Sequence, residues 1–214
     1  MKNLNKYIDH TNLKPFATTA DIEKLCSEAK ENNFASVCVN PCNVPLAKKL
    51  LDGSDVEVCT VIGFPLGQNT TEIKVAETKK ALEDGCQEFD MVINIGALKD
   101  GKQDFVRDEI AAVVKAAEGN TVKVIIETGL LTDEEKAIAT RLSCEAGAHF
   151  VKTCTGVSQG VATVEDIKLM KQNVTGNVLL KASAGIKTYE DALALIEAGA
   201  DRLGTSSGIS IINK

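Results

Sequence analysis

The sequence has little of what marks membrane, secreted or nucleotide-binding proteins. No apolar run approaches the length of a membrane span, and the first residues, MKNLNKYIDHT, contain no signal-peptide core. No Gly-x-Gly-x-x-Gly follows a strand-like run and no Gly-Lys-Ser/Thr loop occurs, which leaves nucleotide-binding folds without support. We therefore expect a cytoplasmic protein that has no membrane partner.

Metal ligands in recognisable patterns are also scarce. The two histidines, His10 and His149, have no carboxylate spaced to join them on a helix, and the seven cysteines include no zinc-type pair. Cys38 and Cys59 lie inside apolar runs, where a free thiol behaves as a small core residue. We therefore expect reduced thiols and no metal site.

A large excess of one charge is missing as well. The formal net charge is −6, and acidic and basic residues are mixed along the chain. This balance argues against nucleic acid or an anionic membrane as the partner, although a small phosphorylated ligand needs only local positive potential.

What the sequence does have is a regular alternation of short apolar runs and amphipathic stretches of helical period. The apolar runs are nearly uninterrupted, as expected for parallel strands covered on both faces. Eight strand–helix units without a composition break predict a single α/β domain over 1–214, a closed (β/α)8 TIM barrel, with an open doubly wound sheet as the alternative. The expected strands are Tyr7–Asp9, Ala35–Val39, Val56–Ile62, Glu88–Asn94, Val122–Glu127, Phe150–Thr153, Val178–Ser183 and Arg202–Thr205.

The helical stretches carry start and stop signals. In Thr70–Gly85, the residues Ile73, Ala76 and Leu82 are expected on the buried face, and the final glycine suits a helix end. Capping boxes open two other helices, formed by Thr132 with Glu135 and by Thr188 with Asp191.

Two of the expected strands end in lysine. FVKTCTG carries Lys152 and VLLKASAGI carries Lys181, each in or at the end of an apolar run that leads into small residues. Chemistry in such barrels gathers at the C-terminal strand ends. Either each ammonium simply lies in solvent, or both point into one barrel mouth. In the second case, repulsion of about 3 kcal/mol together with desolvation would lower the pKa of one amine from about 10.4 to about 7–8, which provides the neutral amine that a Schiff base requires.

Carboxylates occupy further strand ends. Asp90, in EFDMVIN, can keep the second lysine charged and pass protons through water, or it is only part of a buried ion pair. Asp9 serves equally well as a barrel-floor ion pair or as an acceptor for substrate hydroxyls, and Glu127 is similarly ambiguous. Spacing alone does not rank these alternatives.

The last expected strand ends in GTSSG, from Gly204 to Gly208. Glycine allows close backbone approach, serine donates hydrogen bonds, and barrels often bind phosphate after their last two strands. GTSSG and Gly185 together predict a phosphate cradle.

Eight segments matter together: IDHTNLKP, SVCVNP, VIGFPLG, FDMVINIGALK, KVIIETGLLT, FVKTCTG, LLKASAGIKTYEDA and RLGTSSG. Taken in order, these segments resemble deoxyribose-phosphate aldolases, a family of class I aldolases. The resemblance covers almost the whole chain. It implies a barrel that reversibly cleaves 2-deoxy-D-ribose 5-phosphate to acetaldehyde and D-glyceraldehyde 3-phosphate in deoxyribonucleoside catabolism, with no metal or organic cofactor, because a lysine imine is the electron sink.

The resemblance also implies roles for single residues. Lys152 is the expected Schiff-base nucleophile, Lys181 the charged neighbour that perturbs its pKa and joins the proton relay, and Asp90 the proton-relay carboxylate. Asp9 is expected near the substrate hydroxyls. The residues expected around the phosphate are Gly156, Gly185, Gly204, Ser206 and Ser207.

Several positions depart from the family pattern. Cys154 stands where serine is usual, Ala184 replaces one glycine of a usual pair, and Val157 lies where some members have lysine. We expect a more crowded phosphate site with one direct charge fewer. The chain also stops at Lys214, without the tyrosine-ended tail that assists proton transfer in some members, so water or another group is expected to serve.

Other interpretations stay open. A different lysine aldolase or a transaldolase-like enzyme would act on a longer sugar phosphate, and a catalytically inactive barrel would bind a sugar phosphate without forming an imine. A phosphosugar isomerase would need a glutamate base and a histidine electrophile, for which His10 and His149 are poorly placed. The oligomeric state is not given by the sequence, although a homodimer or higher homo-oligomer is common for such barrels.

Overall fold

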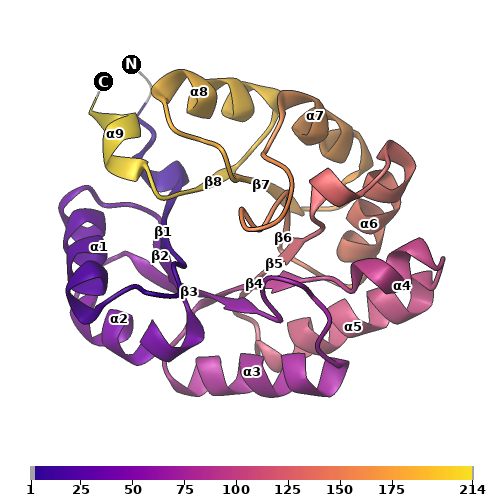
Figure 1. Ribbon diagram of the computed structural model, residues 1–214, viewed down its shortest axis with the longest axis horizontal. Helices are drawn as coiled ribbons and strands as arrows, with labels where there is room; N and C mark the ends of the chain where they lie inside the picture. Colours follow the sequence, from indigo (N-terminus) through magenta and orange to yellow (C-terminus); the bar gives the residue numbers. More distant parts are fainter. Residues whose placement is uncertain (1–2, 214) are drawn as a thin grey trace.

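Eight parallel strands close into a barrel in the computed structural model, which describes residues 3–213. Each strand pairs with the next along the chain, and β8 pairs with β1 (Figure 1). The predicted (β/α)8 TIM barrel is therefore confirmed. The predicted domain, 1–214, extends beyond the described residues at both ends, and its limits stay a prediction. The strands are β1 Ile8–Asn12, β2 Ser36–Val39, β3 Glu57–Ile62, β4 Glu88–Val92, β5 Thr121–Ile125, β6 Phe150–Lys152, β7 Leu179–Ser183 and β8 Arg202–Thr205.

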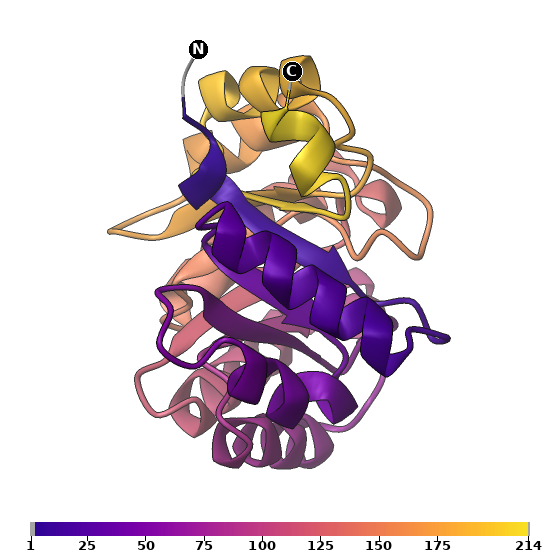
Figure 2. The same cartoon turned by 90° about the vertical axis from the view of Figure 1, so that its left-hand side faces the viewer.

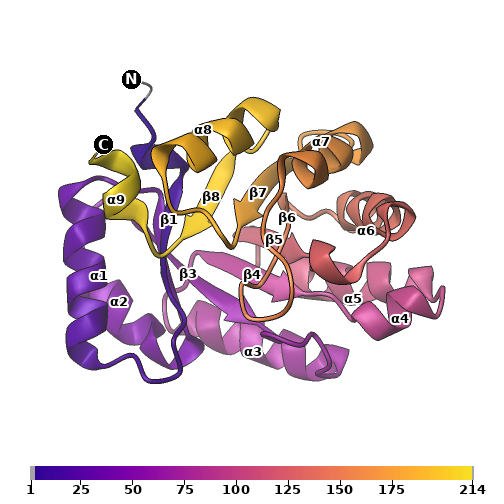
Figure 3. The same ribbon diagram turned by 45° about the horizontal axis from the view of Figure 1, so that its top comes forward.

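Helices surround the barrel on its outside (Figure 3). Both predicted capping boxes are present, at Thr132 with Glu135 and at Thr188 with Asp191. The α-helices are α1 Thr19–Glu31, α2 Val44–Leu50, α3 Thr71–Glu83, α4 Ile95–Lys99, α5 Gln103–Ala116, α6 Asp133–Glu145, α7 Val164–Asn173, α8 Tyr189–Ala198 and α9 Gly208–Ile212. Short 3-10 helices are η1 Asn5–Tyr7, η2 Pro41–Asn43 and η3 Thr128–Leu130.

The strands place apolar side chains outside the barrel and charged ones inside it. On β4, Phe89 and Met91 join the main hydrophobic core, and they alternate with Glu88 and Asp90, which form ion pairs. Successive residues of a strand point to opposite faces, so the alternation separates a hydrophobic layer under the helices from a polar barrel interior. The interior is thus a chemical environment of its own.

Of the apolar face predicted for Thr70–Gly85, Leu82 packs against the main hydrophobic core, whereas the prediction is wrong for Ile73 and Ala76, which are exposed. In α3, Ile73 is 54% exposed, whereas Lys74 is fully buried. The Lys74 ammonium lies 2.8 Å from a carboxylate oxygen of Glu109 on α5 and donates to the carbonyl oxygen of Val92 at 2.8 Å. Because its charge is paired and hydrogen-bonded, a lysine occupies the position at which hydrophobic periodicity predicts an apolar residue.

The loops that follow the strands form one end of the barrel. Figure 2 shows the loop after β1 and the loop after β6 projecting from the same end. Both loops line one cavity. Within residues 3–213, no helix has the length and apolar character needed to cross a bilayer.

Candidate active site

A group of charged side chains fills the centre of the barrel, and the carboxylates and ammonium groups in it are almost completely buried. Its ion pairs connect strands that are far apart in the sequence, so none of its members is isolated. We call this group the charged cluster. Its members are Asp9, Glu88, Asp90, Lys123, Lys152, Lys181 and Arg202.

Strand register explains how the two predicted lysines meet. In the β6–β7 ladder, Lys152 lies directly opposite Lys181. Their sequence neighbours Val151 and Leu180 belong to the outer hydrophobic core, so both lysine side chains point into the barrel. Gly204 on β8 leaves room for this arrangement, because a Cβ there would lie 3.0 Å from Lys181 Cε.

Asp90 links the two lysines. One of its oxygens, Oδ2, lies 2.8 Å from Lys152 Nζ and 2.8 Å from Lys181 Nζ, while Oδ1 lies 2.9 Å from Lys123 Nζ. Burial raises the pKa of the Asp90 carboxyl, but the three ammonium groups outweigh burial and hold that pKa well below its usual range. Asp90 is therefore a carboxylate at neutral pH.

Lys181 is held more firmly than Lys152. Its ammonium forms ion pairs with both Asp90 and Asp9, and these carboxylates outweigh burial and raise the pKa of Lys181. Lys152 forms an ion pair with Asp90 within the described residues and also lines the cavity. The accessible amine of this pair is thus Lys152.

Lys123 was missed by sequence reasoning. It lies opposite Asp90 in the β4–β5 ladder and forms ion pairs with Glu88 at 2.6 Å and with Asp90 at 2.9 Å. Burial lowers the pKa of Lys123, but Asp90 and its other acidic neighbours raise it well above the ordinary value. The available signal was a charged residue in the middle of the apolar run TVKVI, where only a polar barrel interior can accept it.

A cavity of about 1020 Å³ opens above Lys152. It is large enough for a small-molecule substrate. Ala184, which also lines this cavity, has a φ of 78°, in the left-handed region that favours glycine. The cavity lining includes all five residues predicted to surround a phosphate, namely Gly156, Gly185, Gly204, Ser206 and Ser207.

Asp9 lies below this cavity rather than in its wall. The side chain is fully buried; Oδ1 lies 2.7 Å from Arg202, and Oδ2 faces Lys181 and Lys123. These cations outweigh burial and lower the pKa of the Asp9 carboxyl. The geometry corresponds to the ion-pair alternative for Asp9, and contact with substrate hydroxyls stays a prediction.

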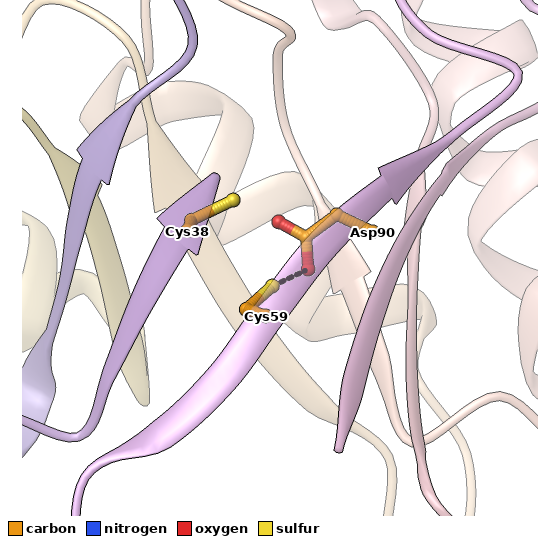
Figure 4. A group of neighbouring side chains, drawn as sticks. All are labelled: Cys38, Cys59 and Asp90. Carbon is orange, nitrogen blue, oxygen red and sulfur yellow. Dashed lines mark hydrogen bonds between the residues drawn. The ribbon is translucent and has the colours of Figure 1, made fainter. Parts of the chain in front are cut away.

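The described residues contain one group of side chains whose ligand atoms lie close enough together to hold a metal ion. This group consists of Cys38, Cys59 and Asp90 (Figure 4). Cys59 donates a hydrogen bond to Asp90 Oδ1 at 3.2 Å, and burial raises the pKa of Cys59 well above its ordinary value. The Lys123 ammonium lies 3.4 Å from Cys59 Sγ. A metal cation would have to displace a thiol proton and compete with three ammonium groups for Asp90, so this group does not fit a metal.

The fold and the site together define a class: a (β/α)8-barrel enzyme with a buried lysine–carboxylate centre whose reachable amine lies beneath a cavity at the C-terminal strand ends. The model of the DeoC/LacD family of aldolases matches residues 4–214. The chain belongs to this family.

Relatives with established names agree. The deoxyribose-phosphate aldolase of Bdellovibrio bacteriovorus is 60% identical over 98% of this chain and 95% of that protein. The deoxyribose-phosphate aldolase of Dictyoglomus turgidum is 57% identical over 98% of each chain. The solved deoxyribose phosphate aldolase from Aeropyrum pernix, described as having a unique tetrameric structure, superposes with a TM-score of 0.89 at 35% identity, over 98% of this chain and 89% of that one.

Proposed function

We propose that this chain is a class I aldolase that reversibly cleaves 2-deoxy-D-ribose 5-phosphate to acetaldehyde and D-glyceraldehyde 3-phosphate, with Lys152 as the nucleophile. The observation that carries the proposal is the shared oxygen of Asp90, which lies 2.8 Å from both Lys152 and Lys181 while Lys152 alone of these three lines the cavity. The catabolism of deoxyribonucleosides is the process that supplies such a substrate.

Charge balance supports Lys152 as the amine that attacks. The charged cluster has four cationic side chains and three carboxylates, so the loss of one proton brings it to neutrality. Lys123 and Lys181 each have more than one carboxylate partner, whereas Lys152 shares its one partner with Lys181. Deprotonation of Lys152 therefore breaks the fewest ion pairs.

The reaction begins when the Lys152 nitrogen adds to the aldehyde carbon C1 of the open-chain sugar. The carbinolamine loses water and becomes a protonated imine. The C3 hydroxyl then gives up its proton to the water that Asp90 and Lys181 hold, the C2–C3 bond breaks, and the electron pair of that bond flows into the imine to form an enamine. D-Glyceraldehyde 3-phosphate leaves with C3 as its aldehyde carbon.

Asp90 and Lys181 handle the protons of the second half. The enamine carbon C2 takes up a proton through water that Asp90 and Lys181 hold, and hydrolysis of the resulting imine releases acetaldehyde and restores Lys152. Lys123 forms an ion pair with Oδ1 of Asp90, so that Oδ2 faces the ammonium groups of Lys152 and Lys181. No metal or organic cofactor is needed in this scheme.

Two further features of the protein belong to the proposal. The tetrameric Aeropyrum pernix relative suggests that this chain also forms a homo-oligomer, which light scattering coupled to gel filtration would test. A cytoplasmic location is supported by the cysteines, all seven of which are free.

Borohydride trapping tests the chemistry directly. Incubation with 2-deoxyribose 5-phosphate and borohydride, followed by peptide mass mapping, should place a reduced adduct on Lys152. The Lys152→Ala variant should form none and should not cleave the substrate. An adduct on another lysine, or a wild-type protein that forms none, would reject the proposal.

A further inference from the structure

The loop between β6 and α7 forms one wall of the cavity. Figure 1 shows it reaching over the mouth of the barrel, and β6, from which it departs, ends at Lys152. A shift of this loop would change the cavity wall around the reactive amine. The loop residues that line the cavity are Thr155, Gly156, Val157, Ser158, Gly160 and Val161.

One buried carboxylate holds the start of this loop. Glu127, just after β5, is 1% exposed, and it accepts hydrogen bonds from the Thr155 backbone N–H at 3.2 Å and from Thr155 Oγ1 at 2.5 Å. Thr155 Oγ1 in turn accepts from the backbone N–H groups of Val157 at 3.2 Å and Ser158 at 3.4 Å. Through one threonine, Glu127 therefore fixes the first turn of the loop.

Both the backbone conformation and the burial of Glu127 are energetically unfavourable. Its φ is 59°, in the left-handed region that non-glycine residues rarely adopt. Within residues 3–213 it has no ion pair, and its carboxylate is compensated by the two donors of Thr155. A buried carboxylate without a counter-ion is expensive, and strained or unpaired groups of this kind concentrate at functional sites.

Glycines let the loop pack closely on both sides. A Cβ at Gly129 would lie 2.0 Å from the carbonyl oxygen of Gln159, and a Cβ at Gly185 would lie 2.8 Å from the Val161 side chain. The loop is thus seated between the segment that follows Glu127 and the segment that carries Gly185. The loop therefore connects the segment after Glu127 with the predicted phosphate side of the cavity.

We propose that Glu127 is a positioning residue that determines how well the cavity binds the phosphate end of the substrate. This inference rests on the proposed function, since Gly156 and Gly185 belong to the predicted phosphate site. Without the Glu127 carboxylate, Thr155 loses its anchor and the Gly156 turn shifts. Lys152 keeps its place, because β6 pairs with β5 on one side and with β7 on the other.

Glu127→Gln tests the proposal with little change of shape. For 2-deoxyribose 5-phosphate, kcat/KM should fall about tenfold, mainly through KM, because a small misplacement of a binding loop has effects of this size or larger. For unphosphorylated 2-deoxyribose, the same ratio should change less than about twofold. Thr155→Val should reproduce this pattern, and Thr155→Ser, which keeps the hydroxyl, should retain wild-type values. The double variant Glu127→Gln/Thr155→Val should be no worse than either single one, because both break the same contact.

The matched control is Glu135→Gln, a carboxylate change in the α6 capping box that does not touch the loop. Equal losses on the two substrates, additive losses in the double variant, or a loss in Thr155→Ser as large as in Thr155→Val would overturn the positioning role. If Glu127→Gln does not fold, Glu127→Asp decides: a shorter carboxylate should also raise KM for the phosphorylated sugar alone. A wild-type protein that leaves 2-deoxyribose 5-phosphate intact would instead refute the proposed function, whereas a wild-type KM in Glu127→Gln refutes only the inference about Glu127.

Discussion

The protein buries lysines in two regions, and the regions differ in how the charge is matched. Outside the barrel, between α3 and α5, Lys74 has Glu109 as its own carboxylate partner at 2.8 Å. Inside the barrel, Asp90 serves Lys123, Lys152 and Lys181 together. The outer pair is neutral, with one cation and one carboxylate, while the charged cluster has one cation more than it has carboxylates. A matched pair holds elements together, whereas an unmatched set leaves one amine free to react.

The outer pair ties two helices to the end of a catalytic strand. Besides its ion pair with Glu109, Lys74 donates to the carbonyl of Val92, and Glu109 accepts from the backbone N–H of Asn94 at 3.2 Å. Burial lowers the pKa of Lys74 and raises that of Glu109, and the attraction between the two opposes both shifts. In the charged cluster the neighbouring charges outweigh burial for Asp9, Asp90 and Lys181, so these three groups stay ionised.

The largest effect should come from removing the unmatched amine. Lys152→Met should lower cleavage of 2-deoxyribose 5-phosphate by about 10⁴-fold or more, since the nucleophile is lost. It should leave the free energy of unfolding unchanged or slightly higher, because the excess positive charge of the cluster is relieved. Steady-state assay and denaturant unfolding measure both quantities. If Lys152→Met were destabilised as much as a variant that lacks Lys74, the matched pair and the charged cluster would not differ in their contribution to stability.

Asp90 should matter for protons more than for imine formation. Asp90→Asn should slow turnover by about 10²–10⁴-fold, the usual contribution of general acid–base catalysis. Acetaldehyde incubated with the enzyme in D2O should exchange its methyl hydrogens quickly with the wild-type protein and slowly with the variant, while borohydride should still trap an adduct on Lys152. Exchange at the wild-type rate would remove Asp90 from the proton relay.

The same comparison explains which parts of the molecule were predictable from the sequence. All eight strands overlap the nearly uninterrupted apolar runs that predict them, since burial under helices selects apolar residues on the outer face of each strand. The meeting of Lys152 and Lys181 follows from the rule that strand ends gather at one face. Lys74 and Lys123 were missed, because neither lies at the end of a strand and the glutamate that pairs with each is 35 residues away in the sequence.

Breaking the matched pair should cost stability and spare the chemistry. Lys74→Met should lower the free energy of unfolding by about 3 kcal/mol, because Glu109 is left buried without a counter-charge. The double variant Lys74→Met/Glu109→Leu should recover to within about 1 kcal/mol of the wild type, since no unpaired charge remains. Below its unfolding transition, Lys74→Met should retain cleavage within about twofold. A loss of turnover in a folded Lys74→Met protein would mean that the outer pair also sets the geometry of the active site.

The smallest effect concerns the floor of the barrel, where Glu57 begins β3 beside Glu88. Partial burial and Glu88 raise the pKa of Glu57 to about 7, and Arg202 and Lys123 oppose this rise. In the unfolded chain a glutamate titrates near pH 4.3, so the folded state holds the proton more tightly and stability falls as pH rises from about 4.3 through 7. Glu57→Gln should therefore be more stable than the wild type at pH 8, by about 1 kcal/mol because Glu57 is only half-buried, and equal to it near pH 4.5. The control is the exposed Glu23→Gln variant, whose stability relative to the wild type should not change between the two pH values. If Glu57→Gln gains the same stability at both pH values, the gain comes from packing and not from the charge of Glu57.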